Sequence, residues 1–209
     1  MARTLNPSNY LKLCIIYLSF FFIFFPWISF SLNELDTQPW IVITNILYIL
    51  TFSNRLIKNF VLFGYMLLVP IFFIAFIDFG HNSIRGFMTY VIFFSTLHVF
   101  YIAFKKHFDI LKKLIFIFNL LWLLSGLLQL IFGAEILSFL VTVRTSMSRG
   151  VTGLAPEPTH YAFYLLFISW LLLVINQKPS KVTISLILVN IAFILFVAKS
   201  SMVFFYCIL

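Results

Sequence analysis

Long, continuous apolar segments run through the chain, and they restrict its fold more than any other feature. The first reads LCIIYLSFFFIFFPWISF, and comparable segments follow it. A helix needs roughly 20 apolar residues to cross a bilayer core about 30 Å thick, whereas strands of a membrane barrel alternate apolar and polar residues over about ten. The composition agrees, with 63% hydrophobic and only 10% charged residues. The sequence therefore predicts an all-α, polytopic helical membrane protein.

Seven of these segments predict full transmembrane helices. They cover Leu13–Leu32, Trp40–Ser53, Phe60–Phe79, Gly86–Phe104, Leu114–Phe132, His160–Asn176 and Val182–Ala198. An eighth begins near Met202 and ends at Leu209, which is too short to cross the membrane at about 1.5 Å per residue. We therefore expect one integral membrane domain over residues 1–209, incomplete at its C-terminus.

Basic residues are distributed unevenly between the two ends of the predicted helices. Ten of the 14 Lys and Arg residues fall on the side of the N-terminus: Arg3, Lys12, Arg55, Lys58, Lys105, Lys106, Lys112, Lys113, Lys178 and Lys181. Cytoplasmic loops of membrane proteins carry an excess of Lys and Arg. The N-terminus is therefore predicted to be cytoplasmic. This spread over several connectors, in a chain of net charge +8, also argues against a nucleic-acid interface, which would gather the charge in one patch.

The longest polar break, residues 133–159, is predicted to be an exterior loop. It contains Arg144 and Arg149 beside hydroxylated residues that include Thr152. Guanidinium groups bind phosphate oxygens in a planar, bidentate way and keep their charge, so these residues could clamp a pyrophosphate. The alternative is that both arginines anchor the loop to lipid headgroups.

The end of this loop, APEPTHYAF, carries the candidate proton-transfer residues. Proline suits the first turn of a helix, so Pro158 is predicted to open the sixth helix with Glu157 at or near its N-cap. Glu157 could orient or deprotonate an acceptor hydroxyl, or it could serve only as a capping carboxylate or ion-pair partner. His160 could be a second proton carrier or simply an interfacial histidine.

Two segments of the chain resemble a known family. The stretch RGVTGLAPEPTHYAFYLLF, followed about thirty residues later by FILFVAKSSMVFFYCIL, is similar to bacterial O-antigen polymerases and O-antigen ligases. Arg149, Thr152, Gly153, Leu154, Glu157 and Pro158 match the family's first pattern, and Lys199 and Ser200 match its second. The resemblance covers roughly residues 140–209, while the first five predicted helices agree with the family only in being helices.

This resemblance implies a multi-pass glycosyltransferase of the bacterial cytoplasmic membrane that joins undecaprenyl-pyrophosphate-linked glycans on the outer side. It implies catalytic roles for Glu157 or His160, substrate binding by Arg149, Thr152 and Lys199, and a chain-length regulator protein as a further partner. Arg144 is a further substrate-binding candidate, from the guanidinium chemistry of the same loop. Members of the family have ten or more helices and a further large exterior loop, which this sequence does not include.

Other functional classes stay open at this point. An O-antigen ligase would use the same donor, and a flippase or transporter of lipid-linked oligosaccharides would bind the same pyrophosphate. An inactive, truncated remnant is a further alternative. The sequence has no phosphate-binding glycine loop, no dinucleotide fingerprint and no zinc-protease motif, so we predict no cofactor and no metal.

Overall fold

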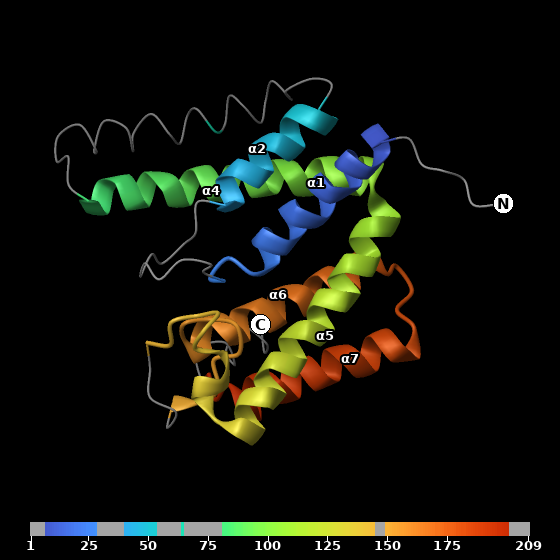
Figure 1. The fold of residues 1–209 in the computed structure, drawn as a ribbon. Coiled ribbons are helices and arrows are strands. Elements are labelled where there is room, and N and C mark those ends of the chain that lie inside the picture. The colour runs from blue at the N-terminus through green and yellow to red at the C-terminus, as the bar shows by residue number, and fades with distance from the viewer. Residues whose placement is uncertain (1–6, 29–39, 54–63, 65–80, 145–148, 201–209) are drawn as a thin grey trace. The chain divides into compact units, whose positions relative to one another are not determined.

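The computed structural model describes residues 7–28, 40–53, 64, 81–144 and 149–200, and all regular structure within them is helical (Figure 1). The chain forms two compact units. Unit 1 comprises Met1–Ile23 and Pro39–Phe108, and unit 2 comprises Phe24–Gln38 and Asp109–Leu209. The all-α prediction is confirmed for the described residues, and the single membrane domain over residues 1–209 stays a prediction.

Unit 1 is held together by hydrogen bonds between otherwise apolar helices. Its described helices are α1 (Pro7–Phe24), α2 (Trp40–Phe52) and α4 (His81–Lys106). The Ser19 hydroxyl of α1 donates to the Thr44 carbonyl of α2 at 2.9 Å. Asn45 of α2 donates through Nδ2 to the hydroxyls of Ser95 (3.0 Å) and Thr96 (3.1 Å) of α4. In a bilayer the lipid is as apolar as the helices, so the hydrophobic effect does little to drive helices together. Hydrogen bonds such as these supply directional contacts instead.

One end of unit 1 is closed around His107. Lys106 Nζ donates to the carbonyl of Phe52 at 2.6 Å, where it satisfies an acceptor at the last residue of α2. The imidazole of His107 packs edge-on against the Phe52 ring, with the ring centroids 4.6 Å apart. Burial lowers the pKa of His107 below its usual 6.5, and the neighbouring charge of Lys106 lowers it further.

We expect the stability of unit 1 to decrease as the pH falls below about 6.5. Because the pKa of His107 is lower in the folded unit than in the unfolded chain, acidification first protonates the unfolded chain. Protonation favours the unfolded chain, so the stabilisation present at neutral pH is lost on acidification. The check is the apparent melting temperature in detergent across about pH 5 to 8. His107→Gln should make this dependence shallower, and an unchanged slope in that variant would contradict the assignment.

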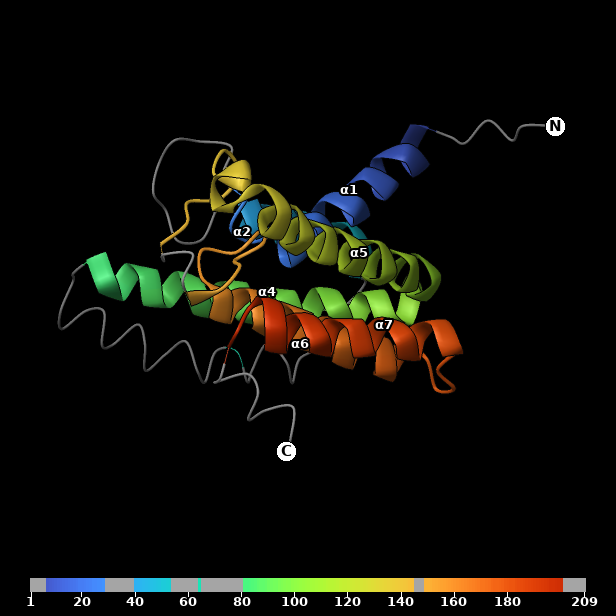
Figure 2. The ribbon, with the colours of Figure 1, turned by 90° about the horizontal axis from the view of Figure 1, so that it is seen from below.

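Within its described residues, unit 2 contains three α-helices, two short helical turns and the polar connector. Its elements are α5 (Phe108–Phe132), the 3₁₀ turn η1 (Ala134–Leu137), α6 (Pro158–Ile175), α7 (Lys181–Ala192) and the π-helical η3 (Phe193–Val197). The three α-helices lie side by side in both views (Figures 1 and 2). At their centre, Asn190 of α7 donates through Nδ2 to Asn119 Oδ1 of α5 and to the Ser169 hydroxyl of α6, each at 2.8 Å. All three side chains are buried, so this junction fixes the packing of the three helices.

In the described part of the chain, three helices are long and apolar enough to cross a membrane: Met88–Lys106, Phe108–Phe132 and Pro158–Ile175. Three shorter apolar helices accompany them, over Asn9–Phe24, Trp40–Phe52 and Lys181–Val197. Six of the seven predicted segments thus contain a helix, and the predicted helix Phe60–Phe79 lies outside the described residues except for Gly64. The finding supports a membrane-associated helical protein.

Several helix boundaries differ from the predicted ones, including the starts of α1 at Pro7 and α4 at His81, and two further differences have a clear cause or consequence. The first helix was expected to continue to Leu32, but α1 ends at Phe24. Pro26 explains this, because a proline has no N–H for the helix and disfavours helical geometry in the residue before it. The fifth helix begins at Phe108 instead of Leu114, so Lys112 and Lys113 belong to its first turns and not to a connector.

Candidate functional site

The polar connector folds against the C-terminal half of α5, where Gln129 holds it. Gln129 Oε1 accepts three hydrogen bonds, from the backbone N–H groups of Thr152 (3.1 Å) and Gly153 (2.7 Å) and from the Thr152 hydroxyl (3.2 Å). Gln129 is fully buried and Thr152 is 3% exposed. One amide oxygen on α5 therefore fixes the middle of the loop.

Tyr161 of α6 packs directly beneath the same loop. Its hydroxyl donates to the carbonyl of Trp122 at 3.1 Å. The two neighbouring glycines make room for it: a Cβ on Gly126 would lie 2.1 Å from the Tyr161 oxygen, and one on Gly153 would lie 2.5 Å from the ring. Gly153 also has φ +56°, a region that favours glycine. Both glycines are thus required by close approach to this tyrosine.

The loop also meets the end of η3, which is distant in sequence. The N–H of Val151 donates to the carbonyl of Val197 at 3.0 Å. Gly150, with φ +125°, lies so close to Ala198 that a Cβ would be 2.3 Å from its carbonyl oxygen. Arg149 directly precedes Gly150, and Lys199 directly follows Ala198. Both residues are exposed and flank this backbone contact. We call residues 149–151 and 197–199 the basic junction.

The backbone geometry of the basic junction is unusual. Lys199 has φ +52°, and it is the one non-glycine residue of the described chain with a positive φ. It follows the π-helical turn η3, whose end is closed by a 2.8 Å bond from Ala198 N–H to the Phe193 carbonyl. Strained residues and π-turns are both enriched at functional sites.

Glu157 and His160 lie at the start of α6, as the sequence predicts. Glu157 is the N-cap, in extended conformation, and Pro158 occupies the first helical position. The Glu157 carboxylate lies 3.8 Å from His160 Nδ1, and both side chains are substantially exposed at 40% and 48%. Trp27 packs edge-on against the His160 ring, with centroids 5.2 Å apart. A carboxylate and an imidazole are thus accessible together at a helix N-terminus.

The remaining predicted residues are placed by the same loop. The N–H of Arg144 donates to the Pro156 carbonyl at 3.0 Å, which brings the exposed Arg144 next to Glu157. Thr152, predicted to bind substrate, is buried and bonded to Gln129, so its visible role is to hold the loop. The substrate roles of Arg144, Arg149, Thr152 and Lys199 stay predictions.

The side chains that position the loop were missed by the sequence reasoning. Gln129 and Tyr161 are the main ones, and both lie within apolar helices. The sequence did offer a signal for Gln129, which is a polar amide within a predicted transmembrane helix. Such a group is costly in contact with lipid, so its presence indicates a hydrogen-bond partner inside the protein. Among the described residues no group of three His, Cys, Asp or Glu side chains could hold a metal ion, and the expectation of metal-free chemistry stays a prediction.

The described residues define a helical protein with three helices long and apolar enough to span a membrane and a polar loop anchored on α5. Comparison of the chain with protein-family models, curated proteins and solved structures finds no match in any of the three.

Proposed function

We propose that the chain belongs to a membrane glycosyltransferase that polymerises undecaprenyl-pyrophosphate-linked oligosaccharide repeat units into surface polysaccharide. One observation carries the proposal: the basic junction brings together the two segments, around Arg149 and around Lys199, that resemble the polymerases and ligases. These segments are separated by the whole of α6 and α7. The backbone contact joins the segments that carry Arg149 and Lys199, and two cationic side chains close together are what a pyrophosphate site needs.

The proposed reaction is a displacement at a sugar carbon. A hydroxyl of the acceptor glycan attacks the anomeric carbon of the donor, the bond between that carbon and the pyrophosphate oxygen breaks, and lipid pyrophosphate leaves with the bonding electrons. Glu157 or His160 takes the proton of the attacking hydroxyl. Arg149 and Lys199 stabilise the negative charge that develops on the leaving group, and fixed charges of this kind contribute about 3 kcal/mol each.

The test is polymer formation by the full-length protein in proteoliposomes supplied with a lipid-linked repeat unit. Arg149→Ala should reduce the rate of polymer formation about 100-fold, because it removes one stabilising group from the transition state. Arg149→Lys should retain part of the activity, since it keeps the charge without the planar fork. Polymer length and rate are read from gels of the released glycan.

The matched control is Lys178→Ala, which removes an exposed lysine from the connector between α6 and α7. It should leave polymer formation unchanged. Wild-type rates in Arg149→Ala would refute the proposed role of the basic junction. Movement of the labelled lipid across the membrane with no glycosidic bond formed would instead identify a transporter.

A further inference from the structure

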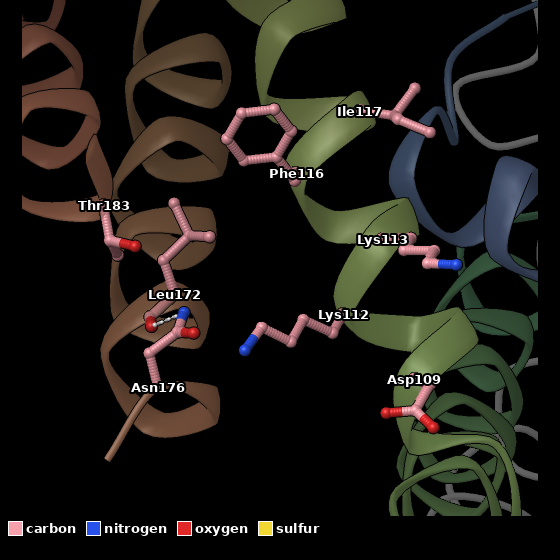
Figure 3. A pocket seen from close by; sticks show the side chains of 8 residues that line it. All are labelled: Asp109, Lys112, Lys113, Phe116, Ile117, Leu172, Asn176 and Thr183. Carbon is pink, nitrogen blue, oxygen red and sulfur yellow. Dashed lines mark hydrogen bonds between the residues drawn. The ribbon is translucent and has the colours of Figure 1, made fainter. Parts of the chain in front are cut away.

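A second site lies at the other end of α5. An open cavity of about 570 Å³ lies between the first turns of α5, the last turn of α6 and the start of α7 (Figure 3). Asp109, Lys112, Lys113 and Phe116 form one stripe of α5 along it, at helical spacings of three and four residues. We call this cavity the lysine groove. None of the residues that form the basic junction lines it.

The polar end of the lysine groove contains the ammonium group of Lys112. Lys112 extends from α5 toward Asn176 of α6 (Figure 3). It makes no ion pair with any described residue, although Asp109 lies one helical turn away. Asn176 Nδ2 is already used in a 2.8 Å bond to the Leu172 carbonyl, and the Thr183 hydroxyl lies 3.0 Å from that of Ser180. The ammonium of Lys112 is therefore the group best placed to meet an anion.

The remainder of the groove is apolar and open. Phe116 and Ile117 follow the lysines by one turn and are 38% and 49% exposed, and Leu172 of α6 forms the opposite wall. A soluble anion would gain nothing from these walls, whereas an acyl chain would bury them. Charge at one end and apolar walls beyond it are complementary to a lipid with an anionic headgroup.

The lysine groove is also far from the polar loop along α5. Lys112 and Gln129 are separated by 17 positions, which corresponds to roughly 26 Å at about 1.5 Å per residue. This approaches the thickness of the hydrocarbon core, about 30 Å. If α5 crosses the membrane, the two sites therefore face opposite leaflets, and the groove lies on the side predicted to be cytoplasmic.

We propose that the lysine groove binds an anionic phospholipid of the leaflet opposite the polar loop. Its phosphate meets the ammonium group of Lys112, and one acyl chain lies between Phe116 of α5 and Leu172 of α6. This site is separate from glycosyl transfer and does not depend on it. It would hold the α5, α6 and α7 ends together through a bound lipid.

The test is native mass spectrometry of the full chain released from nanodiscs that contain either phosphatidylglycerol or phosphatidylcholine. The wild-type protein should retain phosphatidylglycerol in preference to phosphatidylcholine. Lys112→Gln should weaken that retention about fivefold, which corresponds to about 1 kcal/mol for one basic residue at an anionic surface. Lys112 is exposed on the first turns of α5, so the variant should fold normally.

The matched control is Lys178→Gln, an exposed lysine at the same end of unit 2 that does not line the groove. It should retain phosphatidylglycerol as the wild type does. Equal losses in Lys112→Gln and Lys178→Gln would show a diffuse attraction of the surface and would overturn the proposal. Absence of any lipid preference in the wild-type protein, as expected if another protein segment fills the groove, would overturn it too.

Discussion

Gly150→Ala should strongly destabilise unit 2 and separate the loop from the end of η3. A Cβ at this position would lie 2.3 Å from the carbonyl oxygen of Ala198, which is backbone and cannot rotate away. The φ of +125° adds further strain for an L side chain. Strain of about 1–3 kcal/mol and overpacking of about 1–3 kcal/mol act together here. The measurement is the free energy of unfolding in mixed micelles.

Gly133→Ala is the matched control for this substitution. Gly133 also has a positive φ, +96°, but no atom lies within 4 Å of a Cβ built there. It should therefore show only the strain and not the overpacking. Equal losses of stability in the two variants would contradict the close contact between Gly150 and Ala198.

Gln129→Leu should have the second large effect, because it removes the acceptor of three hydrogen bonds at once. The two N–H groups of Thr152 and Gly153 would be left buried without this partner. Each buried donor left unsatisfied costs about 1–3 kcal/mol, so we expect a loss of roughly 2–6 kcal/mol in the free energy of unfolding.

Thr152→Val provides the comparison, since it removes only the hydroxyl donor and keeps both backbone bonds. Its loss should be about 1 kcal/mol, as for an ordinary hydrogen bond. The order of the two losses is the decisive result. A Thr152→Val loss as large as that of Gln129→Leu would mean that the amide of Gln129 does not organise the loop.

Local rules predicted the parts of this fold that depend on neighbouring residues. The start of α6 is an example. Pro158 suits the first helical position because that position tolerates a missing N–H, and Glu157 suits the N-cap, which takes an extended conformation. Both were confirmed in α6. The end of α1 at Phe24 follows from the same rule applied to Pro26, but the apolar pattern that continues to Leu32 masked it.

The contacts that build the site could not be read in this way. The pairing of Val151 with Val197, and of Gln129 with Thr152, joins residues far apart in the chain. Hydrophobic periodicity indicates that a segment is a helix but not which helix it meets. The positive φ of Lys199 was also unexpected, since lysine has no intrinsic preference for that region.

The central claim is that the basic junction binds a lipid pyrophosphate, and binding tests it most directly. The measurement is the affinity of the full-length protein in nanodiscs for undecaprenyl pyrophosphate and for undecaprenol, compared with the double variant Arg149→Gln, Lys199→Gln. We predict that the wild-type protein prefers the pyrophosphate and that the double variant loses this preference, while Lys112→Gln retains it. An equal preference in the wild type and the double variant would contradict the account.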